Sequence, residues 1–102
     1  MADKQFITAQ ELLEDSFRLG RLVLESGFRP DFIVGVWRGG TPVGIAVQEL
    51  LEHSGVLSDH IAIRTSSYEG IEQRGKQIRI HGLGYIVGNA NAESCLLIVD
   101  DV

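Results

Sequence analysis

The hydrophobic pattern in the first third of the chain predicts a helix and then a strand. Over about residues 9–26 the apolar side chains recur at helical spacing and form one broad face: Leu12, Leu13, Phe17, Val23 and Leu24. Thr8 and Glu11 fit a capping box before that helix, and Gly27 fits a stop after it. Residues 32–36, FIVGV, are short and apolar throughout, which is typical of a strand covered on both faces.

A glycine-containing turn and a second helix are expected next. The loop WRGG occupies residues 37–40. Thr41 is expected to cap the following helix, with Pro42 at its first position and an end near His53. The succession of strand, glycine turn and helix is the opening of a βαβ unit.

The middle of the chain alternates in polarity and predicts a hairpin. Residues 60–68 and 77–82 are interpreted as strands that can pair through 61–67 and 77–81. The polar residues 69–76 between them are expected to form a mobile loop.

The last segment predicts a short helix or strand and then a buried strand. Residues 83–90 carry apolar side chains at helical spacing, although Tyr85-Ile86-Val87 would also suit a strand. Residues 95–99, CLLIV, are expected to form the most buried strand, with Asp100-Asp101 at its carboxyl end. Because such a strand needs neighbours on both sides, we expect an α/β domain with a mainly parallel sheet that is incomplete at the C-terminus.

Composition excludes several classes of protein. The chain has 102 residues, 44% of them hydrophobic and 23% charged, which excludes disorder, collagen and coiled coil. No apolar run is long enough for a membrane helix, MADKQF carries no signal-peptide pattern, and the single Cys95 offers neither a disulfide nor a zinc pattern. We therefore expect one domain in a reduced, cytoplasmic setting, without a membrane partner.

The charge distribution favours a small anion over a nucleic acid. The net charge is −5, and residues 64–81 hold four basic and two acidic side chains while residues 82–102 hold three acidic ones and no basic one. A small anion held together with a metal suits this division better than a polyanion does. A solvated, functionless charge pattern is the alternative.

The turn after the first strand is suited to an anion. In an open α/β sheet, ligands bind beyond the carboxyl ends of the strands. Gly39 and Gly40 allow close backbone approach, the next helix directs free amides outward, Arg38 adds a positive fork, and Thr41 can cap the helix or donate a hydrogen bond. A tight turn without a ligand remains the alternative.

The acidic pair after the last strand is suited to a cation or a diol. Asp100 and Asp101 need a neutralising partner, such as Mg²⁺ with its waters or two ribose hydroxyls. Because neighbours on an extended chain point to opposite sides, both can serve one ligand only if the backbone turns there. An acidic strand end in solvent is the alternative.

Other candidate residues have weaker signals. Ser66-Ser67-Tyr68, with the basic stretch that follows, could close over a ligand or form an ordinary exposed hairpin. Cys95 is expected in the core, and the residues His53, His60 and His81 are expected to be structural or exposed. Trp37 could wall a pocket or pack in the core.

Three motifs in order, FIVGVWRGG, then TSSY, then LLIVDDV, resemble the type I phosphoribosyltransferases, closest to the hypoxanthine/guanine and xanthine-guanine branch. The resemblance runs from the first helix to Val102. It implies a three-layer sandwich, and a Mg²⁺-dependent transfer of the phosphoribosyl group from phosphoribosyl pyrophosphate to a purine base in purine salvage.

The resemblance also assigns roles to residues. Trp37-Arg38-Gly39-Gly40, with Thr41, resembles the pyrophosphate-binding loop, with a cis peptide at Trp37–Arg38. Ser66-Ser67-Tyr68 resembles the start of the flexible catalytic loop. Asp100-Asp101 resembles the pair that meets the ribose 2′ and 3′ hydroxyls, directly or through Mg²⁺.

The sequence departs from the family after VDDV, because the loop for the 5′-phosphate and the segment that stacks on the purine are not in it. We therefore expect residues 1–102 to be the N-terminal portion of such an enzyme, inactive or nearly so alone, and to self-associate through an uncovered sheet edge. A non-catalytic module that binds phosphoribosyl pyrophosphate or a nucleotide for regulation is the main alternative. A phosphoacceptor receiver domain fits poorly, because its acidic pair stands near the start of the domain.

Overall fold

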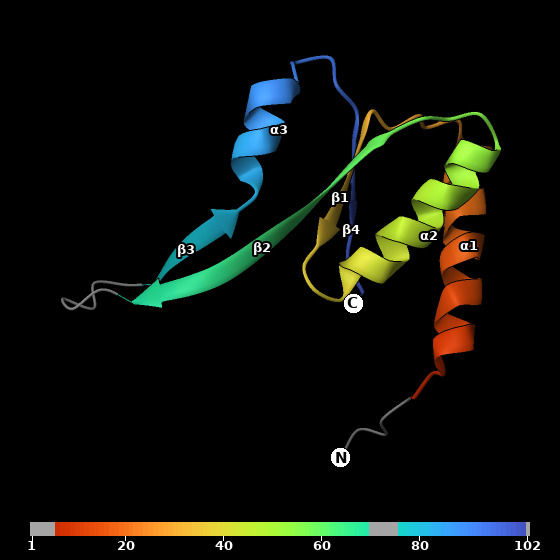
Figure 1. Cartoon of the computed structure of the whole chain (residues 1–102), viewed down its shortest axis with the longest axis horizontal. Helices are drawn as coiled ribbons and strands as arrows, with labels where there is room; N and C mark the ends of the chain where they lie inside the picture. The colour runs from red at the N-terminus through yellow and green to blue at the C-terminus, as the bar shows by residue number, and fades with distance from the viewer. Residues whose placement is uncertain (1–5, 70–75, 102) are drawn as a thin grey trace.

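A sheet with strand order β3-β2-β1-β4 forms the frame of the molecule in the computed structural model, which describes residues 6–69 and 76–101 (Figure 1). Its strands are β1 (Phe32–Val36), β2 (Asp59–Glu69), β3 (Lys76–His81) and β4 (Leu96–Val99). The helices are α1 (Ala9–Ser26), α2 (Gly40–His53) and α3 (Leu83–Asn89). β1 pairs in parallel with both β2 and β4, whereas β3 runs antiparallel to β2. The expected α/β architecture with a mainly parallel sheet is confirmed.

Helix α1 begins and ends where its sequence predicts. Thr8 Oγ1 accepts from the Glu11 amide, and the Glu11 carboxylate accepts from the Thr8 amide, each at 3.0 Å. These bonds satisfy two backbone donors at the helix start and hold the pKa of Glu11 below its usual value. Gly27 ends the helix in the left-handed region, with φ 85°. No helix among the described residues is long and apolar enough to cross a membrane.

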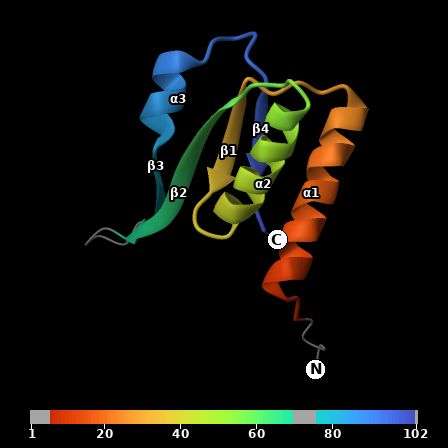
Figure 2. The ribbon, with the colours of Figure 1, turned by 45° about the vertical axis from the view of Figure 1, so that its right-hand side comes forward.

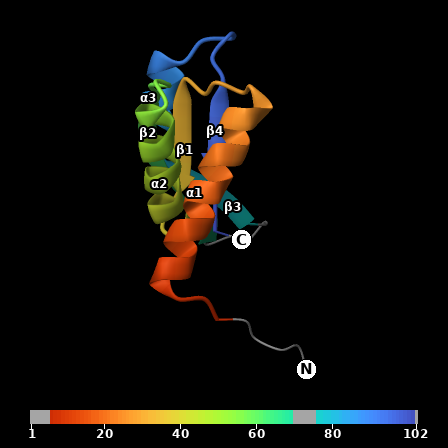
Figure 3. The same cartoon turned by 90° about the vertical axis from the view of Figure 1, so that its right-hand side faces the viewer.

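Helices α1 and α2 pack together on one face of the sheet (Figures 2 and 3). The core under them is a cluster of buried aliphatic side chains from α2, β1 and β4: Ile33, Val43, Val47, Leu51 and Val99. Gly20 lets the two helices approach closely, because a Cβ there would lie 3.3 Å from the Leu50 Cβ. This packing fixes the start of α2 against the sheet.

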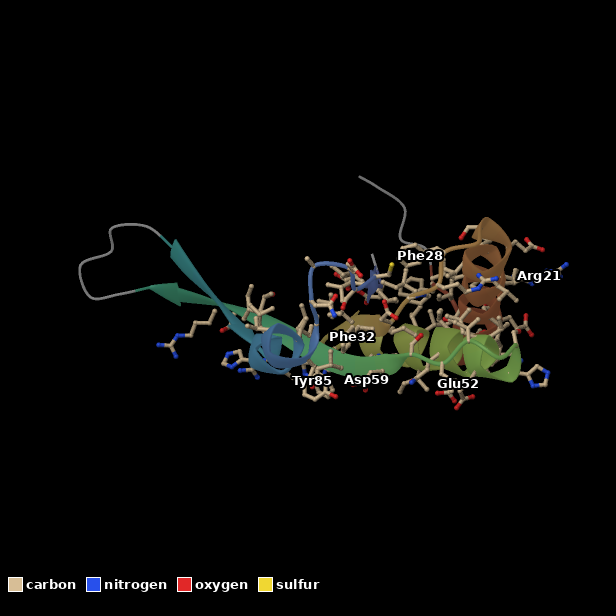
Figure 4. All side chains as sticks on the ribbon, turned by 90° about the horizontal axis from the view of Figure 1, so that it is seen from above. Arg21, Phe28, Phe32, Glu52, Asp59 and Tyr85 are labelled. Atoms are coloured by element: carbon tan, nitrogen blue, oxygen red, sulfur yellow. The ribbon has the colours of Figure 1, made fainter. Side chains whose placement is uncertain are left out.

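Helix α3 lies on the opposite face. Consecutive residues of a strand point to opposite faces. The His60 ring lies against Gly44 of α2, whereas the neighbouring Asp59 carboxylate accepts from the Tyr85 hydroxyl of α3 (Figure 4). That bond raises the pKa of Tyr85 above its ordinary value. The layers are therefore α1 and α2, the sheet, and α3.

The hairpin is confirmed, with small differences at its ends. Its two strands pair from Arg64 opposite His81 to Glu69 opposite Lys76, and it projects away from α1 and α2 (Figure 1). Gly82, expected inside the strand, lies outside it with φ 92°. The predicted mobile loop 69–76 falls largely on residues 70–75, outside the described part of the chain. Of the two alternatives for residues 83–90, the helix is correct.

Three predictions were wrong. Cys95, expected in the core, is half-buried and precedes β4. Thr41 does not cap α2: Gly39 is the N-cap residue and the helix begins at Gly40, so Pro42 is its third residue. The last strand is not the most buried one. Within the described chain β4 lies at the sheet edge, with Ile98 64% exposed, and β1 lies between two strands. An apolar run shows only that a strand can be buried. Which strand lies in the middle of the sheet, and is therefore buried, depends on the pairing order.

Candidate functional site

The glycine turn and the acidic pair lie in contact at one edge of the sheet. β1 and β4 are parallel neighbours in which Gly35 pairs with Val99, so the residues that follow them leave the sheet side by side. Trp37, Arg38 and Gly39 form the turn between β1 and α2, and Asp100 and Asp101 follow β4. In Figure 1 the end of β4 lies beside the start of α2.

Both glycines of the turn are closely approached, Gly39 by a side chain and Gly40 by backbone. A Cβ on Gly39 would overlap the Asp101 carboxylate, lying 2.7 Å from its Oδ1 and closer still to its other atoms. A Cβ on Gly40 would lie 2.9 Å from the Asp100 Cα and would overlap the Val99 carbonyl oxygen. Gly39 itself has an ordinary helical φ of −64°, so absence of a side chain, not backbone freedom, makes the contact possible.

The start of α2 presents hydrogen-bond donors. Gly39 has no side chain to cap the helix, the Thr41 amide donates to the Arg38 carbonyl at 3.1 Å, and Pro42 has no N–H, so Gly40 is the helical residue whose amide is left for a ligand. The Thr41 hydroxyl is buried and has no hydrogen-bond partner. The positive end of a helix, with the Gly40 amide and a hydroxyl donor, suits the oxygens of a phosphate.

The peptide bond between Trp37 and Arg38 is cis, as the resemblance implied. The Trp37 amide donates to the Ile63 carbonyl of β2 at 2.7 Å, which joins the turn to the neighbouring strand. The Trp37 side chain is 51% exposed, so it is not a core residue. Of the two interpretations of Trp37, the pocket wall agrees with the structure, because Trp37 lines a cavity together with residues of β2 and β3.

The acidic pair follows directly after β4. The Asp101 amide donates to the Asp100 carboxylate at 2.8 Å. Both residues line a cavity of about 170 Å³ beside α1, which Asp15 and Ser16 also line. The two acidic residues therefore border one space.

A magnesium ion fits this pair only if a ligand completes its coordination. No group of three or more acidic, histidine or cysteine side chains suited to a metal occurs in residues 6–69 and 76–101. Mg²⁺ commonly takes one or two carboxylates and fills its other positions with water and substrate phosphates. Asp100 and Asp101 beside a phosphate-binding turn supply that kind of partial set.

The third predicted group lies farther along the hairpin. Ser66 is on β2 beyond its pairing with β1, which ends where Val36 meets Ile63. Its hydroxyl lies 3.5 Å from the His81 Nε2. The side chains of Ser67 and Tyr68 lie outside the described part of the structure.

His60 packs between β1 and α2, a role that the sequence pattern did not reveal. Its Nδ1 lies 3.1 Å from the Gln48 Oε1, and the Gln48 amide donates to the Ser58 carbonyl at 3.0 Å. The Gln48 oxygen must then accept, which places the ring proton on Nδ1 and leaves Nε2 facing Gly35 and Gly44. Burial lowers the pKa of His60, and this effect outweighs the negative charge of Asp59, which raises it.

Two glycines in the sequence were the signal that could have predicted the position of the His60 ring. Gly35 lies in the middle of a strand and Gly44 in the first turns of a helix, two places where glycine is unfavourable unless something approaches closely. A Cβ on Gly44 would lie 2.9 Å from His60 Nε2. Both glycines make room for one ring.

Comparison with known proteins identifies the fold. No protein-family model matches the sequence, and no curated protein matches it. Among solved structures, a purine phosphoribosyltransferase from Pyrococcus horikoshii Ot3 superposes with a TM-score of 0.69 at 24% identity, over 97% of this chain and 58% of that one. A hypothetical protein from Neisseria gonorrhoeae with bound ppGpp superposes with a TM-score of 0.70 at 15% identity, over 98% of this chain and 55% of that one. The chain thus spans little more than half the length of these structures, and its fold is that of the type I phosphoribosyltransferases.

Proposed function

We propose that this chain binds phosphoribosyl pyrophosphate and takes part in transferring its phosphoribosyl group to a purine base, with release of pyrophosphate and formation of a nucleoside monophosphate. The observation that carries the proposal is the contact between Gly39-Gly40 and Asp100-Asp101. It brings donors for phosphate and acceptors for sugar hydroxyls to one place, which is what a substrate with both groups requires.

The charges of the site suit the reaction. As the bond between the ribose and the pyrophosphate breaks, negative charge grows on the leaving group and positive charge on the sugar. The Gly40 amide at the start of α2, the Thr41 hydroxyl and Arg38 stabilise the growing negative charge. Asp100 and Asp101 accept from the ribose hydroxyls and orient the sugar.

Asp100 and Asp101 would hold Mg²⁺, directly or through water, and the ion would neutralise charge on the leaving pyrophosphate. In this scheme Ser66, Ser67 and Tyr68 lie at the start of the loop that closes over the bound substrate and keeps water away from the cationic sugar. The remaining parts of a transferase site, including the selection of the base, are proposed to lie outside these residues.

We further propose that residues 1–102 are the N-terminal part of a longer cytoplasmic, self-associating enzyme. The extent of the superposition, 58% and 55% of two longer structures, supports this. The exposed apolar face of β4 supports it as well, because such a face is normally covered.

The test compares binding with turnover. Calorimetry with Mg²⁺ measures the affinity of the chain for phosphoribosyl pyrophosphate, and a pyrophosphate-release assay with guanine, hypoxanthine and xanthine follows turnover by a longer chain. We expect binding by residues 1–102, turnover only by the longer chain, and loss of both with Gly39→Ala, whose Cβ would displace Asp101. Gly84→Ala is the matched control, because a Cβ there meets nothing within 4 Å. A longer chain that releases no pyrophosphate with any purine rules out the transferase.

A regulatory nucleotide-binding module is the second candidate. It is favoured by the Neisseria structure, which holds ppGpp on the same fold. Nucleotide binding that depends on Gly39 but is never followed by turnover, in the longer chain as well, would identify this function.

A further inference from the structure

A second cavity lies on the other side of β1 from the acidic pair. Its volume is about 270 Å³, and it is lined by the turn after β1, the middle of β2 and the end of β3 with the residue that follows it: Trp37, Ala62, Ile63, Arg64, His81 and Gly82. The acidic pair lies next to β4, so the strand order β3-β2-β1-β4 places the turn between the two spaces.

The side chains of this cavity are of two kinds. Trp37 offers a half-exposed indole. Arg64 and His81 are directly opposite each other in the antiparallel ladder, so both project to the same face of the hairpin. None of the six lining residues is acidic. Two nitrogen-rich side chains placed opposite each other without a carboxylate between them favour an anion there.

The backbone is closely packed at the cavity. Gly82 is in the left-handed region with φ 92°, and a Cβ on it would lie 2.5 Å from the Ala62 carbonyl oxygen. The Ser66 hydroxyl lies 3.5 Å from His81 Nε2 and so orients the imidazole from outside the cavity. The Trp37 amide is held on β2 by its bond to the Ile63 carbonyl. The indole, the guanidinium and the imidazole therefore stand on one connected piece of sheet.

We propose that this cavity binds a planar aromatic compound that carries one anionic group, with the ring against Trp37 and the anion between Arg64 and His81. At about 270 Å³ the cavity falls below the ~300–1,000 Å³ typical of drug-sized ligands, which suits one ring system such as a single nucleobase with its phosphate. This cavity shares Trp37 with the turn of the proposed transferase site, but Arg64 and His81, which would hold the anion, belong to this cavity alone, so the proposal does not depend on the transferase.

The chain carries its own reporter for a test, since Trp37 is its only tryptophan. Adenosine 5′-monophosphate has both the ring and the anion, adenosine has only the ring, and ribose 5-phosphate has only the anion. We expect adenosine monophosphate to quench or shift the Trp37 fluorescence at concentrations at least about tenfold lower than either partial compound, because stacking on an aromatic and a charge-assisted bond each contribute.

Variants separate this cavity from the glycine turn. Arg64→Gln is expected to weaken binding of adenosine monophosphate about tenfold or more, whereas Arg79→Gln, which removes the same charge from the same hairpin outside the cavity lining, changes it less than about twofold. Gly39→Ala is expected to leave this binding intact. The proposal is overturned if adenosine monophosphate causes no fluorescence change, if Arg64→Gln and Arg79→Gln have equal effects, or if Gly39→Ala abolishes the change.

Discussion

Thr41 illustrates a residue whose side chain lacks a partner inside the free protein. A buried hydroxyl without a hydrogen bond is unfavourable, and valine has nearly the same shape and helix propensity. We expect Thr41→Val to leave the free energy of unfolding unchanged or to raise it by up to about 1 kcal/mol. The same change should weaken phosphoribosyl pyrophosphate binding about fivefold to tenfold, because a donor to the phosphate is lost.

Urea unfolding and calorimetry measure the two effects of Thr41→Val on one sample. Thr65→Val, on the exposed hairpin, is the control and should change neither quantity. A clear loss of stability in Thr41→Val would mean that the hydroxyl has a partner within the protein, and its assignment as a ligand donor would be withdrawn.

His60 makes stability depend on pH. Burial lowers its pKa in the folded protein, whereas the unfolded chain takes up the proton near the ordinary value of 6.5. Between these two values the unfolded state binds more protons, so the free energy of unfolding falls as the pH drops from 7.5 through 6.5 and below. Above the unfolded value the contribution is fully present.

Urea titrations of the wild type at pH 7.5 and 5.5 measure the His60 dependence. The loss of stability between the two pH values should shrink in His60→Gln and persist in His53→Gln, since His53 is exposed at the end of α2. An unchanged loss in His60→Gln would assign the dependence to other groups.

At the scale of elements, two glycines distinguish the effect of backbone conformation on stability from the effect of packing. A Cβ on Gly27 and a Cβ on Gly88 both meet nothing within 4 Å, but only Gly27 has a positive φ, of 85°. Gly27→Ala should therefore lower the free energy of unfolding by about 1 kcal/mol through strain at the end of α1. Gly88→Ala, inside α3, should raise it by about 0.5–1 kcal/mol through helix propensity. Thermal or urea unfolding of the two variants measures these effects. A change in the free energy of unfolding of the same sign in both variants would contradict this account.

The elements that the sequence predicted well have local causes. The capping box at Thr8, the left-handed Gly27 and the short apolar strand at Phe32–Val36 are fixed by neighbours within a few residues, so their positions could be read from the pattern. Thr41 was misassigned because the helix starts earlier, after Gly39, which has no side chain to cap it. Gly39 lies against Asp101, a contact between residues distant in sequence that no local pattern reveals. The packing of His60 between β1 and α2 also depends on three separate segments, and no local pattern reveals it.

For the whole molecule, the pairing order rather than hydrophobicity decides where the core lies. Ile33 on β1 and Ile98 on β4 are the same residue type in parallel neighbouring strands, yet Ile33 is 0% exposed and Ile98 is 64% exposed. Alternation explains this, because Ile33 faces α2 and Ile98 lies on the opposite face of an edge strand. From the sequence alone the two strands are equally apolar.

Truncation of these two isoleucines tests the position of the core. Ile33→Ala should lower the free energy of unfolding by about 2–5 kcal/mol, because it opens a cavity among close-packed side chains. Ile98→Ala should change it by about 0.5 kcal/mol or less, as for other surface positions. Urea unfolding with sedimentation at several protein concentrations measures both. If Ile98→Ala is as damaging as Ile33→Ala and the loss depends on concentration, the outer face of β4 is covered in solution by a second copy of the chain, since binding to the folded state alone raises its stability by mass action.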